Sequence, residues 1–185
     1  MMVYKEKQRQ INLLKWLSIA LILKLVYLDV FPGASYVQHL LTYLAFYKSL
    51  SYHPGPSLAK RYIQIGYVLL LLQLFLDGMF WHYWLLILTV AIDVLIVYEF
   101  FKMIRGIEEE EKQASSTVRI MKTYMSLAVL VILSWTFLMN VDYFSQIVLL
   151  VVGAVILFAI NLRLLIHIRS LKKQIKASLH FVTYS

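Results

Sequence analysis

The placement of lysine and arginine around six apolar runs constrains the fold of this chain more than any other feature. The runs cover approximately residues 11–30, 35–50, 62–78, 80–102, 121–140 and 144–167. All but one of the 18 lysines and arginines lie near the two termini or near the second and fourth connections, and the other three connections contain none. Basic residues are retained on the cytoplasmic side of a membrane, and about 20 apolar residues suffice for one helical crossing. The pattern therefore predicts six transmembrane helices with both termini in the cytoplasm.

The overall composition also favours a membrane environment. Hydrophobic residues make up 61% of the 185 residues and charged residues 15%, and the mean hydropathy is +0.73. Soluble domains are about 45–50% apolar and about 25% charged, so this chain has too few polar side chains to cover a surface in water. The net charge of +8 does not indicate nucleic-acid binding, because the cations follow the ends of the apolar runs. We predict an all-α, polytopic integral membrane protein of a plasma membrane, and the usage of lysine, tyrosine and isoleucine is typical of a bacterial one.

The runs group into a single transmembrane helical-bundle domain that covers residues 1–185. We place three helical hairpins at about 11–50, 62–102 and 121–167, and an amphipathic cytoplasmic tail at 168–185. Each of the three non-basic turns carries one aspartate, which indicates either a diverged triplication or repeated use of similar interfacial residues. The second run is short. If residues 36–50 lay in the interface instead of crossing, there would be five crossings.

Two ionisable residues interrupt the apolar runs, Lys24 in the first and Asp93 in the fourth. Counting about 1.5 Å per residue from the ends of the runs places Asp93 about 15 Å and Lys24 about 18 Å deep, near the middle of a bilayer core about 30 Å thick. An unpaired charge at that depth costs at least about 2.5 kcal/mol, so each residue is the expected partner of the other. Two interpretations are open: a structural ion pair that fixes which hairpins face each other, or a site that couples proton or ion movement.

Gln73 and Asn161 complete the candidate intramembrane polar site with Lys24 and Asp93. Polar side chains within membrane-spanning helices either line a polar path or form hydrogen bonds between helices, worth about 0.6 kcal/mol each on average. Both interpretations are kept at this point.

A second candidate cluster lies at the predicted outer ends of the helices. Its members are Asp29, His39, Asp77, His82 and Asp142. Imidazole and carboxylate groups can together bind a divalent metal or respond to pH. The spacing matches no metal-binding motif, and the absence of cysteine excludes thiolate ligands, disulfides and thiolate catalysis. We therefore predict no metal and no cofactor.

The sequence carries no catalytic signature: it has no nucleophile elbow, no phosphate-binding loop and no dinucleotide-binding glycine pattern. We expect a small non-catalytic membrane protein that binds a partner protein or lipid, as a subunit, a regulator or an immunity-type factor. The alternative is a small ion- or proton-coupled transporter or channel subunit, with Lys24 and Asp93 at the midplane of the bilayer.

Membrane lipids are the first expected partners. The lysines of the C-terminal tail would contribute about 1 kcal/mol each at an anionic surface. The four consecutive glutamates at 108–111 are expected to form a solvated face. Gly153 and Ala154 in the last run offer a surface for close helix approach, which would suit a homo-oligomer.

Overall fold

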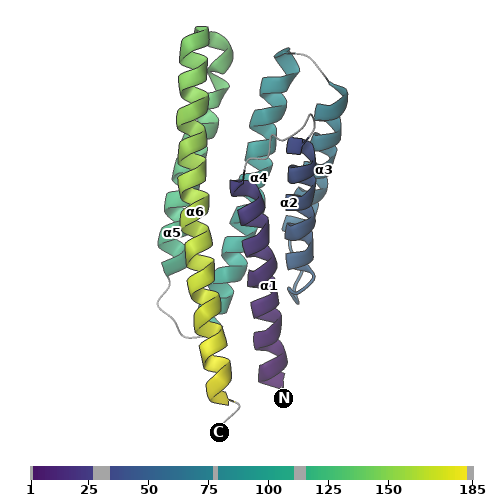
Figure 1. Ribbon diagram of the computed structural model, residues 1–185, viewed down its shortest axis with the longest axis vertical. Coiled ribbons are helices and arrows are strands. Elements are labelled where there is room, and N and C mark those ends of the chain that lie inside the picture. The colour runs from purple at the N-terminus through teal and green to yellow at the C-terminus, as the bar shows by residue number, and fades with distance from the viewer. Residues whose placement is uncertain (1, 27–33, 77–78, 111–115, 183–185) are drawn as a thin grey trace.

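The computed structural model describes residues 2–26, 34–76, 79–110 and 116–182, and these residues are almost entirely helical (Figure 1). Six α-helices follow one another along the chain: α1 (Met2–Leu25), α2 (Ala34–Leu50), α3 (Ala59–Phe75), α4 (Met79–Glu110), α5 (Ser116–Thr136) and α6 (Tyr143–Val182). A short 3₁₀ turn, η1 (Leu138–Asn140), comes before α6. No β-strand occurs in the described residues, which confirms the predicted all-α class.

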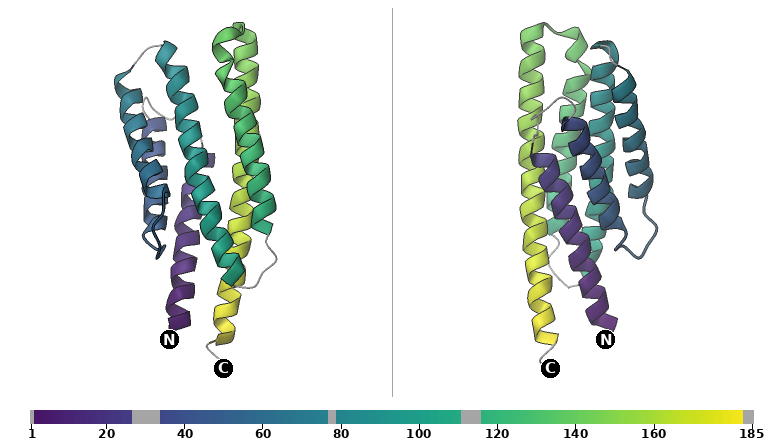
Figure 2. Two further views of the ribbon diagram at one scale, coloured as in Figure 1. Left: turned by 180° about the vertical axis from the view of Figure 1, so that it is seen from behind. Right: turned by 45° about the vertical axis from the view of Figure 1, so that its right-hand side comes forward.

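The helices form a ring in which each helix contacts the next along the chain and α6 returns to contact α1. Their long axes run roughly parallel, and both chain termini lie at the same end of the bundle (Figures 1 and 2). Short connections favour antiparallel neighbours, as in other helical bundles. The N-terminal part of α1, the α2–α3 connection and the C-terminal parts of α4 and α6 therefore share one end, which we call the terminal end.

Three helices, rather than the six that the sequence predicts, are long and apolar enough to cross a membrane. The candidate spans among the described residues are Tyr83–Glu110, Ser116–Thr136 and Tyr143–Leu179, and they indicate association with a membrane. Helices α2 and α3 have 17 residues each, a length of about 26 Å against a hydrocarbon core of about 30 Å. Helix α1 is longer, with 24 residues, but its repeated lysines lower its hydropathy.

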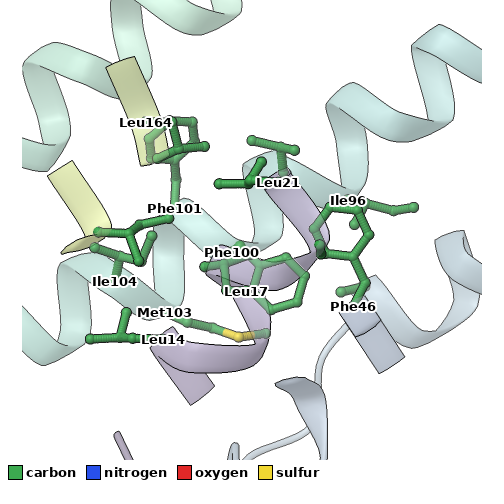
Figure 3. Packing of buried hydrophobic residues seen from close by; sticks show 14 of the residues in the cluster. Leu14, Leu17, Leu21, Phe46, Ile96, Phe100, Phe101, Met103, Ile104 and Leu164 are labelled. Atoms are coloured by element: carbon green, nitrogen blue, oxygen red, sulfur yellow. The ribbon is translucent and has the colours of Figure 1, made fainter. Parts of the chain in front are cut away.

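Helix α1 supplies the centre of the hydrophobic core. Leu14, Leu17 and Leu21 are fully buried, and their spacing of three and four positions puts them on one face of the helix. Figure 3 shows these leucines facing aromatic side chains of α2 and α4, where the rings of Phe46 and Phe100 stack with centroids 5.3 Å apart. Buried residues from all six helices join this core. The least hydropathic of the long helices therefore contributes much of the buried core.

The predicted cytoplasmic tail at 168–185 is, as far as residue 182, a continuation of α6. Its Leu171 and Ile175 side chains are buried, and Lys7 of α1 donates a hydrogen bond of 2.9 Å from its Nζ atom to the Ser178 hydroxyl. Apolar residues at helical spacing give this part of α6 a buried face, and the Lys7–Ser178 hydrogen bond joins it to α1.

Gly153 packs within the chain instead of offering a free surface for oligomerisation. A Cβ atom at this position would overlap the indole ring of Trp135 on α5, which donates a hydrogen bond from Nε1 to the Leu149 carbonyl at 3.0 Å. By contrast, a Cβ atom at Gly106 would meet no atom within 4 Å. The glycine that the sequence assigns to a contact between copies is already used between α5 and α6.

We expect Gly153→Ala to destabilise the protein, because overpacking against Trp135 costs about 1–3 kcal/mol. Gly106→Ala is the matched control, and it should leave the melting temperature unchanged or raise it, since alanine favours a helix interior by about 0.8–1 kcal/mol over glycine. The measurement is thermal unfolding of both variants in one detergent. A Gly153→Ala variant more stable than the wild type would contradict the packing described here.

Candidate functional site

Lys24 and Asp93, which the sequence places at one depth, lie together in the structure. The Lys24 Nζ atom is 2.6 Å from Asp93 Oδ2, and the Tyr43 hydroxyl donates a second hydrogen bond of 3.0 Å to Asp93 Oδ1. The Asp93 side chain is 6% exposed and that of Lys24 18%. Both carboxylate oxygens therefore have a donor, and the pair joins α1, α2 and α4.

Tyr43 is a member of this site that the sequence analysis missed. Its ring is completely buried and packs edge-on against Tyr67, with centroids 5.6 Å apart. A Cβ atom at Gly66 of α3 would lie 2.6 Å from Tyr43 Cζ, so the ring occupies space that only glycine leaves open. The glycine within an apolar run was the available signal, because glycine there often marks the close approach of another group.

His39 lies one helical turn before Tyr43 on α2, and its imidazole is half-buried. Its place in the predicted outer cluster stays a prediction. Of the other predicted members of that cluster, Asp29 and Asp77 lie outside the described residues, and the side chain of His82 does as well. The described residues contain no group of three His, Cys, Asp or Glu side chains suited to a metal ion.

Asp142 serves as a cap for α6. Its carboxylate accepts hydrogen bonds from the Ser145 hydroxyl at 2.6 Å and the Ser145 backbone N–H at 3.1 Å, which is the bonding of a helix N-cap. These bonds lower the pKa of the Asp142 carboxyl below its usual value. Because this carboxylate is fully exposed and already bonded to its own helix, the structure gives it a local role.

Gln73 and Asn161 lie in two further contacts between helices. Gln73 of α3 donates from Nε2 to the Thr89 hydroxyl at 2.8 Å, and to the Leu85 carbonyl of α4 at 3.3 Å. Asn161 of α6 accepts a hydrogen bond of 3.1 Å from the Tyr124 hydroxyl of α5. Within the described chain no hydrogen bond connects either amide to the Lys24–Asp93 pair. The four predicted residues therefore make three separate links between helices.

A buried cluster near the terminal end also escaped the sequence analysis. His167 Nε2 lies 2.7 Å from the Thr117 hydroxyl and 3.2 Å from Glu108 Oε1, and Glu108 accepts a 3.3 Å hydrogen bond from the Thr117 backbone N–H. Glu108 is almost fully buried, whereas Glu109 and Glu110 are exposed. The expected solvated run of glutamates therefore includes one carboxylate that binds the first turn of α5, where a negative charge is favourable.

A cavity of about 470 Å³ opens at the terminal end, between α1, the α2–α3 connection and α4. Its lining includes charged side chains of both signs: Lys5, Glu6, Arg9, Lys102 and Glu110. Three buried apolar residues also line it, namely Leu13, Met103 and Ile107. None of the three side chains of the ion-pair site belongs to this lining. We call this feature the terminal cavity.

No family model, curated protein or solved structure matches the chain.

We expect Asp93→Leu and Lys24→Met each to destabilise the protein by about 3–5 kcal/mol, because each leaves the opposite charge buried without its partner. The double variant should be more stable than either single variant, since neither charge then remains. Thermal or denaturant unfolding in one detergent provides the comparison.

The control is Arg105→Met, which breaks the Arg105–Glu109 pair. That pair has the same 2.6 Å separation, but both of its side chains are more than half exposed. An exposed pair contributes only about 0–1 kcal/mol, so this variant should unfold almost as the wild type does. If the single variants of Lys24 and Asp93 were as stable as the Arg105→Met control, the buried pair would not be important for stability.

Proposed function

We propose that this chain is a non-catalytic integral membrane protein that acts by binding a partner protein or a lipid at its terminal end. All six helices lie in a plasma membrane as three hairpins, with both termini in the cytoplasm. The buried polar residues hold the helices to one another, and the charged terminal end provides the binding surface. A subunit, a regulator or an immunity-type factor would have these properties.

The outward faces of α2 and α3 support six crossings in spite of their short length. Leu40, Leu41 and Leu44 of α2 are 44–50% exposed, and Val68 and Leu71 of α3 are 54% and 55% exposed. Soluble monomers rarely expose contiguous apolar patches of this kind, whereas lipid would cover them. Membranes accommodate slightly short spans by local thinning at a modest cost.

The basic side chains support the orientation. Every lysine and arginine in the described residues except Lys24 lies between the level of the ion pair and the terminal end, or in the connections there. Cytoplasmic segments of membrane proteins carry this excess of lysine and arginine. The terminal end is therefore the cytoplasmic one in this proposal.

One observation favours a binding function over a transport function. Both oxygens of Asp93 are bonded, to Lys24 and to Tyr43, and the terminal cavity does not reach these side chains. A carboxylate that moves a proton or an ion must exchange its partners along a polar path. A fully bonded pair between three helices is better suited to holding them in place.

Cysteine labelling tests the topology, and the absence of native cysteine removes any background. We expect exposed positions Leu76→Cys and Asn140→Cys to react with a membrane-impermeant maleimide in intact cells. Ser51→Cys and Ser170→Cys, also exposed, should react only after the membrane is permeabilised. If Ser51→Cys and Leu76→Cys reacted from the same side, α3 would not cross the membrane and the topology would be wrong.

A second candidate function, an ion- or proton-coupled transporter or channel subunit, is favoured by the buried Lys24–Asp93 pair, with His39 one helical turn from Tyr43. Proton and cation flux into liposomes that contain the purified protein separates the two functions. The binding proposal predicts the same background flux for the wild type, for Asp93→Asn and for empty liposomes. A wild-type flux that disappears in a folded Asp93→Asn protein would establish transport instead.

A further inference from the structure

The terminal cavity lies at the depth of phospholipid headgroups if the ion pair marks the middle of the membrane. Lys102 and Glu110 follow Asp93 on α4 by about 14 Å and about 26 Å, at about 1.5 Å per residue. Half of the hydrocarbon core is about 15 Å thick, and the headgroup layer lies outside it. The cavity therefore extends from the edge of the hydrocarbon into the headgroup layer. This step rests on the proposed membrane placement.

Two cations on the rim are available to hold an anion. Lys5 and Arg9 are four positions apart on α1, so they lie on the same face of the helix, and both are exposed. Neither has an ion-pair partner within the described part of the chain. Lys102, the third cation, is bonded to the buried Glu99 at 2.6 Å. A phosphate group suits the Lys5–Arg9 pair, because arginine binds phosphate oxygens through two parallel hydrogen bonds.

The same cavity offers acceptors for a donor group. Gln10 donates from Nε2 to Glu110 Oε2 at 2.6 Å, which fixes its amide, and its Oε1 atom is buried without any hydrogen-bond partner. A buried acceptor without a donor is unfavourable, so a ligand with N–H groups would satisfy it. The carboxylates of Glu6 and Glu110 on the rim add attraction for a positive charge.

The imidazole of His53, which also lines the cavity, adds no positive charge to it. Burial lowers the pKa of its imidazole, so the ring is neutral near pH 7. The rim thus presents Lys5 and Arg9 on α1, Glu6 and Gln10 next to them on the same helix, and Glu110 on α4. The buried side chains of Leu13, Met103 and Ile107 provide an apolar surface beside them. The volume of about 470 Å³ falls in the usual range for small-ligand sites, about 300–1,000 Å³.

We propose that the terminal cavity binds the zwitterionic headgroup of a phosphatidylethanolamine-type lipid, with the phosphate at Lys5 and Arg9 and the primary ammonium at Gln10 Oε1 and Glu110. A choline headgroup has no N–H group and leaves the Gln10 oxygen unsatisfied. An anionic headgroup such as glycerol carries the same phosphate charge but no ammonium group, so nothing in it is attracted to Glu6 and Glu110.

The test is titration calorimetry of the purified full-length chain in detergent with short-chain lipids of three headgroups: ethanolamine, choline and glycerol. We expect the ethanolamine lipid to bind at least about tenfold more tightly than the other two, a difference of about 1.4 kcal/mol. Arg9→Gln and Glu110→Gln should each weaken its binding about tenfold. Lys173→Gln, an exposed position on α6 outside the cavity, is the control for general basic charge and should bind as the wild type does.

Equal binding of the three lipids, or unchanged binding by both cavity variants with their melting temperatures intact, would overturn the proposal. Glycerophosphoethanolamine, which lacks acyl chains, distinguishes the source of the headgroup. Weak binding of this compound supports a lipid, and binding as tight as that of the lipid would overturn the lipid as the natural source. Cysteine labelling tests the membrane placement independently of lipid binding. If labelling gives the proposed topology but the three lipids bind equally, the headgroup site is wrong and the membrane placement stands.

Discussion

The ion pair between Lys24 and Asp93 is the contact on which the arrangement of α1, α2 and α4 depends. A buried carboxylate or ammonium group is unfavourable unless it is bonded, so the helices that carry these two groups must meet at this point. The Tyr43 hydroxyl brings α2 to the same point, and Gly66 of α3 leaves the space that the tyrosine ring needs. One interaction thereby constrains four of the six helices.

Other buried polar side chains also link helices, through hydrogen bonds between uncharged groups. Gln73 with Thr89 links α3 to α4, and Asn161 with Tyr124 links α5 to α6. Between these links the helices are held by van der Waals packing. At Gly153, for example, the absence of a side chain leaves room for the indole ring of Trp135. Polar bonds therefore fix which helices meet and at what level, while the apolar side chains supply contact area. Most of the lysines and arginines in the described residues lie near the terminal end.

Much of this arrangement could be predicted from the sequence, because a charged residue inside an apolar run can be accommodated in only a few ways, such as pairing with an opposite charge. Lys24 and Asp93 interrupt the apolar runs at matching depth, so their pairing follows from depth alone. Their third partner could not be found in this way, since Tyr43 is one of 13 tyrosines and only its three-dimensional position beside Gly66 distinguishes it. Glu108 was similarly hidden in a run of glutamates, because a run of like charges does not reveal which member faces inward.

The expectation of six helices that are each apolar enough to span was not met, for a physical reason. Most side chains of α1 between Ile11 and Leu25 are buried or half-buried against the rest of the protein, so this helix does not need the uniform hydropathy of a lipid-facing helix. Asp142 of the predicted outer cluster is bonded to its own helix, because a carboxylate just before a helix is close to backbone N–H groups that have no partner within the helix.

Exchange of the two charges tests the central claim most directly. Lys24→Asp and Asp93→Lys each bring two like charges together at this buried position, whereas the double variant restores one charge of each sign. The account predicts that each single variant unfolds at a lower temperature than the wild type in the same detergent, and that the double variant recovers much of the loss. A double variant no more stable than the two single variants would show that the residues do not act as a pair, and it would contradict the account.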